Sequence, residues 1–250
     1  MNEKITNCLN CNKPLNKKQI SKKGHFCCPG CATSYRQKAH DPDIFEIENK
    51  DILYYLLGLI FTDGNLDKEE SRITLSLTQE NVIRTLYPYF CDTQKRKVYE
   101  YTPKNCQNAN TCYTILNTNT ATISRLKLMT MTPCNTATKN FPDFPIKNVG
   151  AFLRGVFDGD GCVTISMIKY GKAYKRISIT CAAPVFKDKL VMLLELLGLH
   201  PTVVIDSRRK DNEVKTYYIC LNKQDEIKQF HDIIYNDAEI WFDYKRQKFE

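Results

Sequence analysis

The sequence lacks a long hydrophobic run, because its longest apolar stretch, Leu53 to Phe61, is far shorter than the roughly 20 residues that cross a bilayer. It also lacks the apolar core of a secretory signal, since its first residues include Lys and Cys instead. These absences argue against a membrane protein and against export, and they predict an intracellular location in the cytoplasm, the nucleoid or an organelle matrix. A disulfide framework is therefore not expected, although the chain contains 12 cysteines.

Almost all of the net positive charge lies in the first 40 residues, and little lies elsewhere. The 250-residue chain has a formal net charge of +8, yet residues 1–40 hold eight Lys or Arg and one acid, Glu3, which leaves the rest almost neutral. The cationic segment predicts a polyanionic partner. A solubilising tail is the alternative, but clustered cysteines favour a folded unit. The hydrophobic content of 42% is normal for a globular core.

Cysteines cluster in the same segment. The sulfur donors are Cys8, Cys11, Cys27, Cys28 and Cys31, and four thiolates suit a tetrahedral Zn²⁺ ion. About 40 residues bury too little surface to fold alone, so a metal would stabilise the fold. Residues 1–40 are therefore predicted to form a zinc-finger-like basic module. The fourth ligand is open: a C-x2-C knuckle favours Cys28, similarity to short "FCS" fingers favours Cys27, and His25 is a weaker option.

An internal repeat is the strongest pattern in the rest of the chain. Two apolar, helix-like runs, Leu56 to Gly64 and Phe152 to Gly161, each contain an internal glycine and end in Asp-Gly. Strand-like and helix-like segments then follow in the same order, so both halves are expected to be αββαββα. The segments located by pattern are strands 72–78, 97–101 and 112–117 with helices 81–90 and 120–128, and strands 175–181, 202–207 and 214–221 with helices 185–197 and 224–235.

Proline-containing stretches are predicted to separate these parts. Residues 41–50, which include Asp41-Pro42-Asp43, and residues 129–149, which contain three prolines, are interpreted as linkers. The two halves are then residues 51–128 and 150–250. The fold class is α+β, with a pseudo-two-fold body that has the two motif helices at its centre.

The paired motifs, their spacing and the shared element order resemble the LAGLIDADG homing endonuclease family over residues 50 to 250. The resemblance implies saddle-shaped antiparallel sheets and cleavage across the minor groove that leaves short 3′ overhangs. Asp63 and Asp160 match the catalytic, metal-binding acidic position. Phe61 departs from the acid usually found two residues earlier, and Asp158 keeps it. A basic residue near the last strand often assists in this family, which indicates Lys215.

The residue types of the motifs suit that chemistry. Gly58 and Gly155 are expected at a close helix–helix interface. Asp63 and Asp160 would then lie at two adjacent helix C-termini, where negative charge accumulates and a divalent cation, Mg²⁺ or Mn²⁺, is needed beside a phosphate. Gly64 and Gly161 are expected to be left-handed C-caps.

Polar and basic side chains along the strands and turns are candidates for DNA contacts. These residues are Arg72, Thr74, Ser76, Thr78, Lys95, Arg96 and Lys97 in the first half, and Arg176, Ser178, Thr180, Arg208, Arg209 and Lys210 in the second.

The expected function is site-specific cleavage of double-stranded DNA by a monomeric, metal-dependent homing endonuclease, as in intron homing, at a long asymmetric site with no membrane partner. One alternative is a non-cleaving nucleic-acid-binding protein of the same fold, either an RNA-splicing maturase or a DNA-binding regulator. A second alternative places the function in the zinc module, as a protein-interaction adaptor.

Overall fold

The computed structural model describes residues 6–21, 24–37, 40–102, 110–133, 137–169, 172–206 and 214–250. The chain divides into two compact units, residues 1–40 together with 92–96, and residues 41–91 together with 97–250, which we call the body. Among the residues described, no helix is both long and apolar enough to span a bilayer.

The N-terminal module is a small, cysteine-rich unit. Its helices are α1 (Lys17–Ser21) and α2 (Pro29–Gln37). A tight turn precedes them: Asn7 and Pro14 form an isolated antiparallel bridge, and Asn12 between them adopts a left-handed φ of 57°. This turn brings the first two cysteines close together in space.

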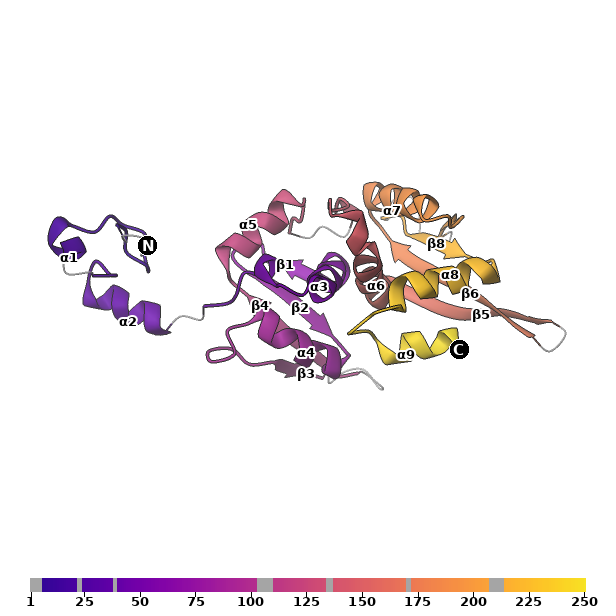
Figure 1. Cartoon of the computed structure of the whole chain (residues 1–250), viewed down its shortest axis with the longest axis horizontal. Coiled ribbons are helices and arrows are strands. Elements are labelled where there is room, and N and C mark those ends of the chain that lie inside the picture. The colour runs from indigo at the N-terminus through magenta and orange to yellow at the C-terminus, as the bar shows by residue number, and fades with distance from the viewer. Residues whose placement is uncertain are drawn as a thin grey trace. The chain divides into compact units, whose positions relative to one another are not determined.

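The body consists of two halves with the same order of elements (Figure 1). The first half contains α3 (Lys50–Asp63), β1 (Gly64–Leu66), β2 (Ile73–Leu77), α4 (Glu80–Phe90), β3 (Tyr99–Tyr101), β4 (Cys112–Asn117) and α5 (Thr120–Leu128). The second contains α6 (Val149–Asp160), β5 (Gly161–Lys169), β6 (Lys172–Cys181), α7 (Pro184–Leu196), β7 (Thr202–Ile205), β8 (Tyr217–Leu221) and α8 (Gln224–Tyr235). Short helices η1 (Ile44–Glu46), η3 (Ile146–Asn148), α9 (Asp243–Arg246) and η4 (Gln247–Phe249) lie outside the repeat.

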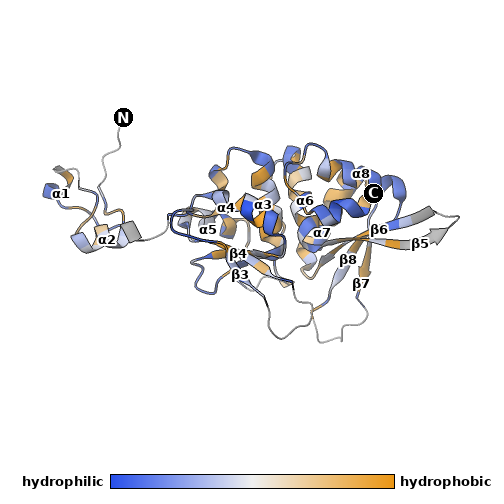
Figure 2. Ribbon diagram, turned by 90° about the horizontal axis from the view of Figure 1, so that it is seen from below, coloured by the Kyte–Doolittle hydropathy of each residue, from blue (hydrophilic) through white to orange (hydrophobic). Residues whose placement is uncertain are grey.

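Each half forms a four-stranded antiparallel sheet with matching topology, β1-β2-β4-β3 and β5-β6-β8-β7. Helices cover one face of each sheet, and the other face is open (Figure 2). The side-chain alternation explains this arrangement, because every second residue of the central strands is buried on the helix side. These buried residues are Ile73, Leu75 and Leu77 in β2, and Ile177, Ile179 and Cys181 in β6.

The α+β class and the duplicated αββαββα order predicted from the sequence are confirmed. The residue pattern had located all but one strand of each half. The strands without predicted bounds are β1 and β5, which begin directly after the motif helices at Gly64 and Gly161. They were hard to locate because each begins at the glycine of an Asp-Gly pair, which is expected to cap the preceding helix and not to start a strand.

Helices α3 and α6 pack against each other through their glycines. A Cβ atom on Gly58 would lie 2.8 Å from the Gly155 Cα atom, and a Cβ on Gly155 would lie 2.9 Å from the Gly58 Cα atom. Real Cβ atoms do not approach other atoms so closely, so only glycine permits this backbone contact. Helix α3 also begins in a defined way, since the Asn49 side chain accepts hydrogen bonds from two backbone amides in its first turn.

The expectation of left-handed glycine caps is wrong. Gly64 has φ −73° and ψ 142°, and Gly161 has φ −89° and ψ 156°, so both are extended. Glycine is required there for space instead: a Cβ on Gly64 would lie 2.8 Å from the Ile60 Cα atom, and one on Gly161 would lie 2.5 Å from the Phe157 carbonyl oxygen. Each glycine thus lets a strand leave the helix without a turn.

A buried polar network joins the two halves beside the glycine contact. The carboxylate of Asp158 is inaccessible to solvent and accepts hydrogen bonds from the Tyr55 hydroxyl (2.8 Å), the Phe242 amide (2.9 Å) and the Tyr235 hydroxyl (3.4 Å). The buried Arg154 guanidinium donates to Asp51 (2.5 Å). Burial raises the pKa of Asp158 to about 6, although its hydrogen bonds oppose the shift.

The two segments interpreted as linkers pack on the body. Within residues 41–50, Ile44 and Ile47 are buried and Asp41 accepts a hydrogen bond from the Thr118 amide (2.8 Å). Within residues 129–149, the Phe144 ring lies 4.4 Å from the Phe152 ring, measured between centroids. Both segments therefore contribute to the core of the body.

We expect Gly58→Ala and Gly155→Ala to destabilise the body. Helix propensity alone would stabilise each variant by about 1 kcal/mol, whereas forcing a methyl group into the α3–α6 contact should cost roughly 1–3 kcal/mol or more. Urea unfolding of each variant against the unchanged chain measures the difference. A free energy of unfolding that stays equal or rises would contradict the contact.

The stability of the body should fall as pH rises from about 4 to about 6. An acid whose pKa is raised on folding from 3.8 to about 6 binds more protons in the folded state, so its destabilising effect develops over this interval and is complete above it. Asp158→Asn can still accept from Tyr55 and Phe242, and it should reduce the total fall in stability across this interval by an amount on the order of 2 kcal/mol. Denaturant unfolding across the interval tests this, with the exposed Asp188→Asn as control. An equal fall in the free energy of unfolding for both variants would argue against it.

Candidate active site and metal sites

Asp63 and Asp160 are the last residues of α3 and α6. Helices α3 and α6 run parallel, because they touch at Gly58 and Gly155 and again, further along both helices, at their C-terminal ends. A Cβ on Gly159 would lie 2.5 Å from the Asp63 Oδ2 atom, so that carboxylate lies against the backbone next to Asp160. The structure therefore brings the two sequence-predicted acids together.

The pKa values of these two acids depend on burial and on the charged and polar groups at the helix ends. Burial raises the pKa of Asp160 to about 6; Lys139 opposes the shift and the negative charge of Asp63 adds to it. Burial also raises the pKa of Asp63, while the Thr62 hydroxyl, 2.9 Å from Oδ2, opposes that shift. Two carboxylates at two negative helix ends form an anionic site. Such a site can hold a divalent cation through hard oxygen donors.

Two buried lysines accompany the acids, and the sequence pattern indicated neither of them. The Lys139 ammonium donates to the Phe61 carbonyl (2.7 Å) and lies 3.8 Å from the Asp160 carboxylate. The Lys245 ammonium donates to the carbonyls of residues 157, 158 and 159 at 3.0, 2.5 and 3.1 Å. Lys139 thus binds one C-terminal carbonyl of α3, and Lys245 binds three C-terminal carbonyls of α6. Burial lowers the pKa of Lys245, and the three nearby aspartates oppose the shift.

These lysines occupy matching places in the repeat. Lys139 follows α5 and Lys245 follows α8 at nearly the same distance along the chain, which is the signal that could have identified them. Lys215, the basic residue indicated by the family resemblance, is exposed and precedes β8. Among the described residues, the cations that influence both acids are Lys139 and Lys245. A role for Lys215 stays a prediction.

The first sheet presents polar side chains on its open face. Thr74 and Ser76 alternate with the buried residues of β2, and the Ser76 hydroxyl lies 2.7 Å from the Thr114 hydroxyl. Arg72 is about half exposed and pairs loosely with Asp67 at 3.8 Å. The remaining candidates of this half, Thr78, Lys95 and Lys97, are exposed, whereas Arg96 is half-buried.

In the second sheet, Arg176, Ser178 and Thr180 lie on the open face and are half-buried. The Arg176 guanidinium donates to the Cys220 sulfur at 2.8 Å, so this side chain lies along the sheet. The cluster Arg208-Arg209-Lys210 lies outside the described residues.

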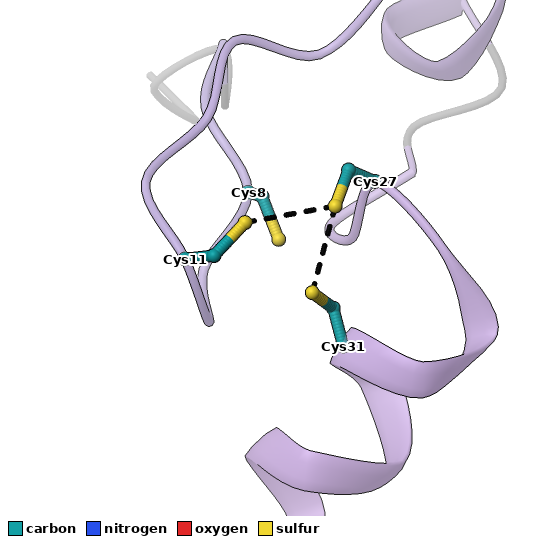
Figure 3. A group of neighbouring side chains, drawn as sticks. All are labelled: Cys8, Cys11, Cys27 and Cys31. Carbon is teal, nitrogen blue, oxygen red and sulfur yellow. Dashed lines mark hydrogen bonds between the residues drawn. The ribbon is translucent and has the colours of Figure 1, made fainter.

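Four sulfur atoms of the N-terminal module converge. Those of Cys8, Cys11, Cys27 and Cys31 all lie within 4.8 Å of one another (Figure 3). Cys28 is exposed, and its sulfur instead accepts a hydrogen bond from the Cys31 amide at 3.4 Å. Of the two fourth-ligand candidates, the structure therefore places Cys27 in the group. Four thiolates at these distances fit a tetrahedral zinc ion.

The local environment favours a thiolate in this group. Burial raises the pKa of Cys8, but the backbone amides of Cys27, Cys11 and Asn10 outweigh it and bring the pKa to about 6. Neighbouring thiols, first that of Cys31, raise the pKa of Cys27. Crowded sulfurs of this kind need a shared cation for all to ionise.

Comparison with known proteins identifies the fold. Residues 147–235 match the model of the LAGLIDADG-like domain. The structure of the homing endonuclease I-WcaI bound to its DNA recognition sequence is similar with a TM-score of 0.54 at 13% identity, covering 81% of this chain and 87% of that one. The N-terminal LAGLIDADG domain of DUF199/WhiA is similar with a TM-score of 0.50 at 15% identity, covering 82% and 92%. No curated protein sequence matches the chain.

We expect Cys27→Ser to lose the metal of the N-terminal module and Cys28→Ser to retain it. Serine oxygen is a poor zinc ligand, so loss of Cys27 leaves three thiolates, whereas the Cys28 sulfur lies outside the group. Zinc content per chain, measured by elemental analysis after dialysis, separates the two variants. Retention of zinc by Cys27→Ser together with its loss from Cys28→Ser would reverse the assignment.

Proposed function

Because this chain has the duplicated LAGLIDADG fold, with residues 147–235 matching the LAGLIDADG-like domain, we propose that it is a site-specific, divalent-metal-dependent endonuclease that cleaves double-stranded DNA. The proposal rests chiefly on one observation: Asp63 and Asp160 lie side by side at the ends of two parallel helices. A fold alone does not determine an activity, so the geometry of this site is what supports an endonuclease.

The place of the acid pair suits a duplex substrate. Strands β1 and β5 start immediately after the two aspartates, and each is the edge strand of its sheet. The acids therefore lie where the two sheets begin. A duplex bound across both open faces would pass the acid pair with one sheet on either side, which provides DNA contacts on both sides of the cut.

The donor set fits Mg²⁺ or Mn²⁺. Carboxylate oxygens of Asp63 and Asp160, together with water and phosphate oxygens, match the hard ligands that these ions prefer. When bound, the cations would ease deprotonation of an attacking water and stabilise the leaving 3′ oxygen. The chain's own residues fix the geometry: the glycine contact positions the acids, and Lys139 and Lys245 hold the helix ends and offset part of their negative charge.

The target is expected to be long and asymmetric, since the open faces of the two sheets carry different residues. The zinc-binding N-terminal module, with its positive charge, would add affinity for the phosphate backbone or lengthen the site. We include the candidate DNA contacts on β2 and β6 and the turn cluster at 95–97 in this proposal. Intron homing and a monomeric state are part of the same proposal.

A non-cleaving DNA-binding protein is the second candidate, and one observation favours it. Lys139 already lies 3.8 Å from Asp160, and Lys245 is buried against the C-terminal end of α6, so fixed cations partly neutralise the acids without any metal. Acids and lysines arranged in this way can stabilise the fold without taking part in catalysis. Selection of cleaved sites from a randomised duplex pool, with and without Mg²⁺, distinguishes the two candidates.

We expect Asp63→Asn and Asp160→Asn each to reduce double-strand cleavage of a selected site by more than roughly a hundredfold, because each removes a metal ligand. Duplex affinity should stay the same or rise, since a negative charge near phosphate is lost. Cleavage of the duplex and gel-shift titration without added Mg²⁺ measure the two effects separately.

The matched control is Asp188→Asn, which removes an exposed carboxylate from the surface of α7. Its cleavage should equal that of the unchanged chain. Normal cleavage by either Asp63→Asn or Asp160→Asn would rule out the proposed site, whereas sequence-specific binding with no cleavage by any variant would support the second candidate.

A further inference from the structure

A cavity of about 450 Å³ lies beside the second sheet, between β6, α8 and the C-terminal segment, and we call it the α8 cavity. Its lining includes Lys175, Ile227, Lys228, His231, Arg246 and Phe249. The volume is within the roughly 300–1,000 Å³ of small-molecule pockets. Lys175 alternates along β6 in step with Ile177 and Ile179, which are buried on the helix side. The cavity therefore lies on the helix side of the sheet, away from the open face to which we assign the duplex.

Positive side chains from three separate elements line the cavity: Lys175 of β6, Lys228 of α8 and Arg246 of α9. The Lys175 ammonium donates a hydrogen bond to the Phe249 carbonyl at 2.6 Å. Among the residues that the structure describes, neither the Lys228 side chain nor the Arg246 side chain has a hydrogen-bond or ion-pair partner. These two charges are therefore available to an anion.

Two acids line the same cavity and leave these cations unpaired. Asp232 lies 3.1 Å from the Nδ1 atom of His231. Within the described part of the chain, Glu250 forms no ion pair with any of the three cations. Three cationic side chains outnumber the two acidic ones, so the side chains of the α8 cavity carry a net positive charge even with a neutral His231.

Arg246 is held in a way that suits an oxyanion. Its Cζ atom lies 4.3 Å from the centre of the Trp241 ring and 5.5 Å from the centre of the Tyr235 ring. Because rings pack on the face of the guanidinium, its N–H groups remain at the edge, where they match two oxygens of one phosphate. Ile227 and Phe249 add apolar surface to the same cavity, which fits the organic part of a phosphate ester.

The first half lacks these charges at the matching places. The two halves align on the pairing of their first two strands, on the buried residues of α5 and α8, and on the two buried lysines at the motif-helix ends. This alignment places Ser71, Ser124 and Asn140 where the second half has Lys175, Lys228 and Arg246. Neutral side chains at all three places show that the shared fold does not require the positive charges. The charge of the α8 cavity therefore indicates a role specific to the second half.

We propose that the α8 cavity is a binding site for a small organic phosphate ester. The side chains of Arg246 and Lys228 bind the phosphate oxygens, and Lys175 adds a third positive charge. A phosphate ester carries up to about two negative charges, so it matches three cations better than a monocarboxylate does. Sugar phosphates and nucleotides share the chemistry that this site recognises. The site is separate from the acid pair and does not depend on cleavage.

The test titrates the full chain with phenyl phosphate, without added magnesium. Binding is followed by phosphorus NMR and by the fluorescence of Trp241, the only tryptophan of the chain, which reports on the cavity because Arg246 stacks on it. We expect saturable binding with a dissociation constant on the order of 1 mM or tighter. Inorganic phosphate, which lacks the ring, should bind more weakly, and phenol, which lacks the phosphate, should not bind.

Arg246→Gln and Lys228→Gln should each weaken the binding of phenyl phosphate by at least roughly tenfold, because each removes a charged hydrogen-bond donor. The matched control is Lys248→Gln, which removes an exposed lysine close to Arg246 but outside the cavity lining; its affinity should stay within about twofold. Glu250→Gln removes a repelling carboxylate and should bind at least as tightly as the unchanged chain. Competition by glucose phosphate and by adenosine monophosphate identifies which organic group the cavity prefers.

Absence of saturable binding below about 10 mM would overturn the proposal. Equal losses of affinity in Lys248→Gln and Lys228→Gln would also overturn it, since they indicate charge attraction without a defined site. Full displacement of phenyl phosphate by a random DNA duplex would assign the cavity to the DNA backbone instead. If Arg246→Gln fails to fold, the exposed Lys228→Gln provides the test alone. Asp63→Asn should bind phenyl phosphate normally, so failure of the endonuclease proposal leaves this result unaffected.

Discussion

The backbone contact between α3 and α6 is the constraint on which the candidate active site depends. Gly58 and Gly155 allow the helix axes to approach until main-chain atoms touch. Since Asp63 and Asp160 lie five residues further along each helix, the same contact fixes the separation of the two carboxylates. Any side chain at either glycine would push the helices apart and with them the acids, so packing and proposed chemistry share one interface.

That closeness creates an electrostatic problem at the helix ends. Two carboxylates and the C-terminal carbonyls of two helices concentrate negative charge there. Burial raises the pKa values of Asp63 and Asp160, and the negative charge of Asp63 adds to the shift at Asp160. Two buried ammonium groups, those of Lys139 and Lys245, offset part of this negative charge. They donate hydrogen bonds to carbonyls of α3 and α6. The charge that remains is the part available to a divalent cation and a phosphate.

Sequence patterns located the acids and the glycines but not the lysines. Asp63 and Asp160 stand in duplicated motifs, whose repetition is visible in one dimension. Lys139 lies in a proline-containing segment interpreted as a linker, and Lys245 lies in a short helix outside the repeated elements. Both act through tertiary contact with residues more than 75 positions away, which no local periodicity encodes. The extended Gly64 and Gly161 likewise depend on the space left by neighbouring atoms.

The sequence by itself determined the duplicated αββαββα order, the acidic pair and the cysteine-rich, basic first 40 residues, because periodicity, repetition and composition are properties of neighbours along the chain. Only the tertiary structure decided that Cys27 rather than Cys28 joins the sulfur group, that Asp158 is buried in the helix interface, and that three cations from separate elements line the α8 cavity. Those outcomes depend on which way each side chain points once distant segments meet, and a strand or loop can turn either way until its packing partners are in place.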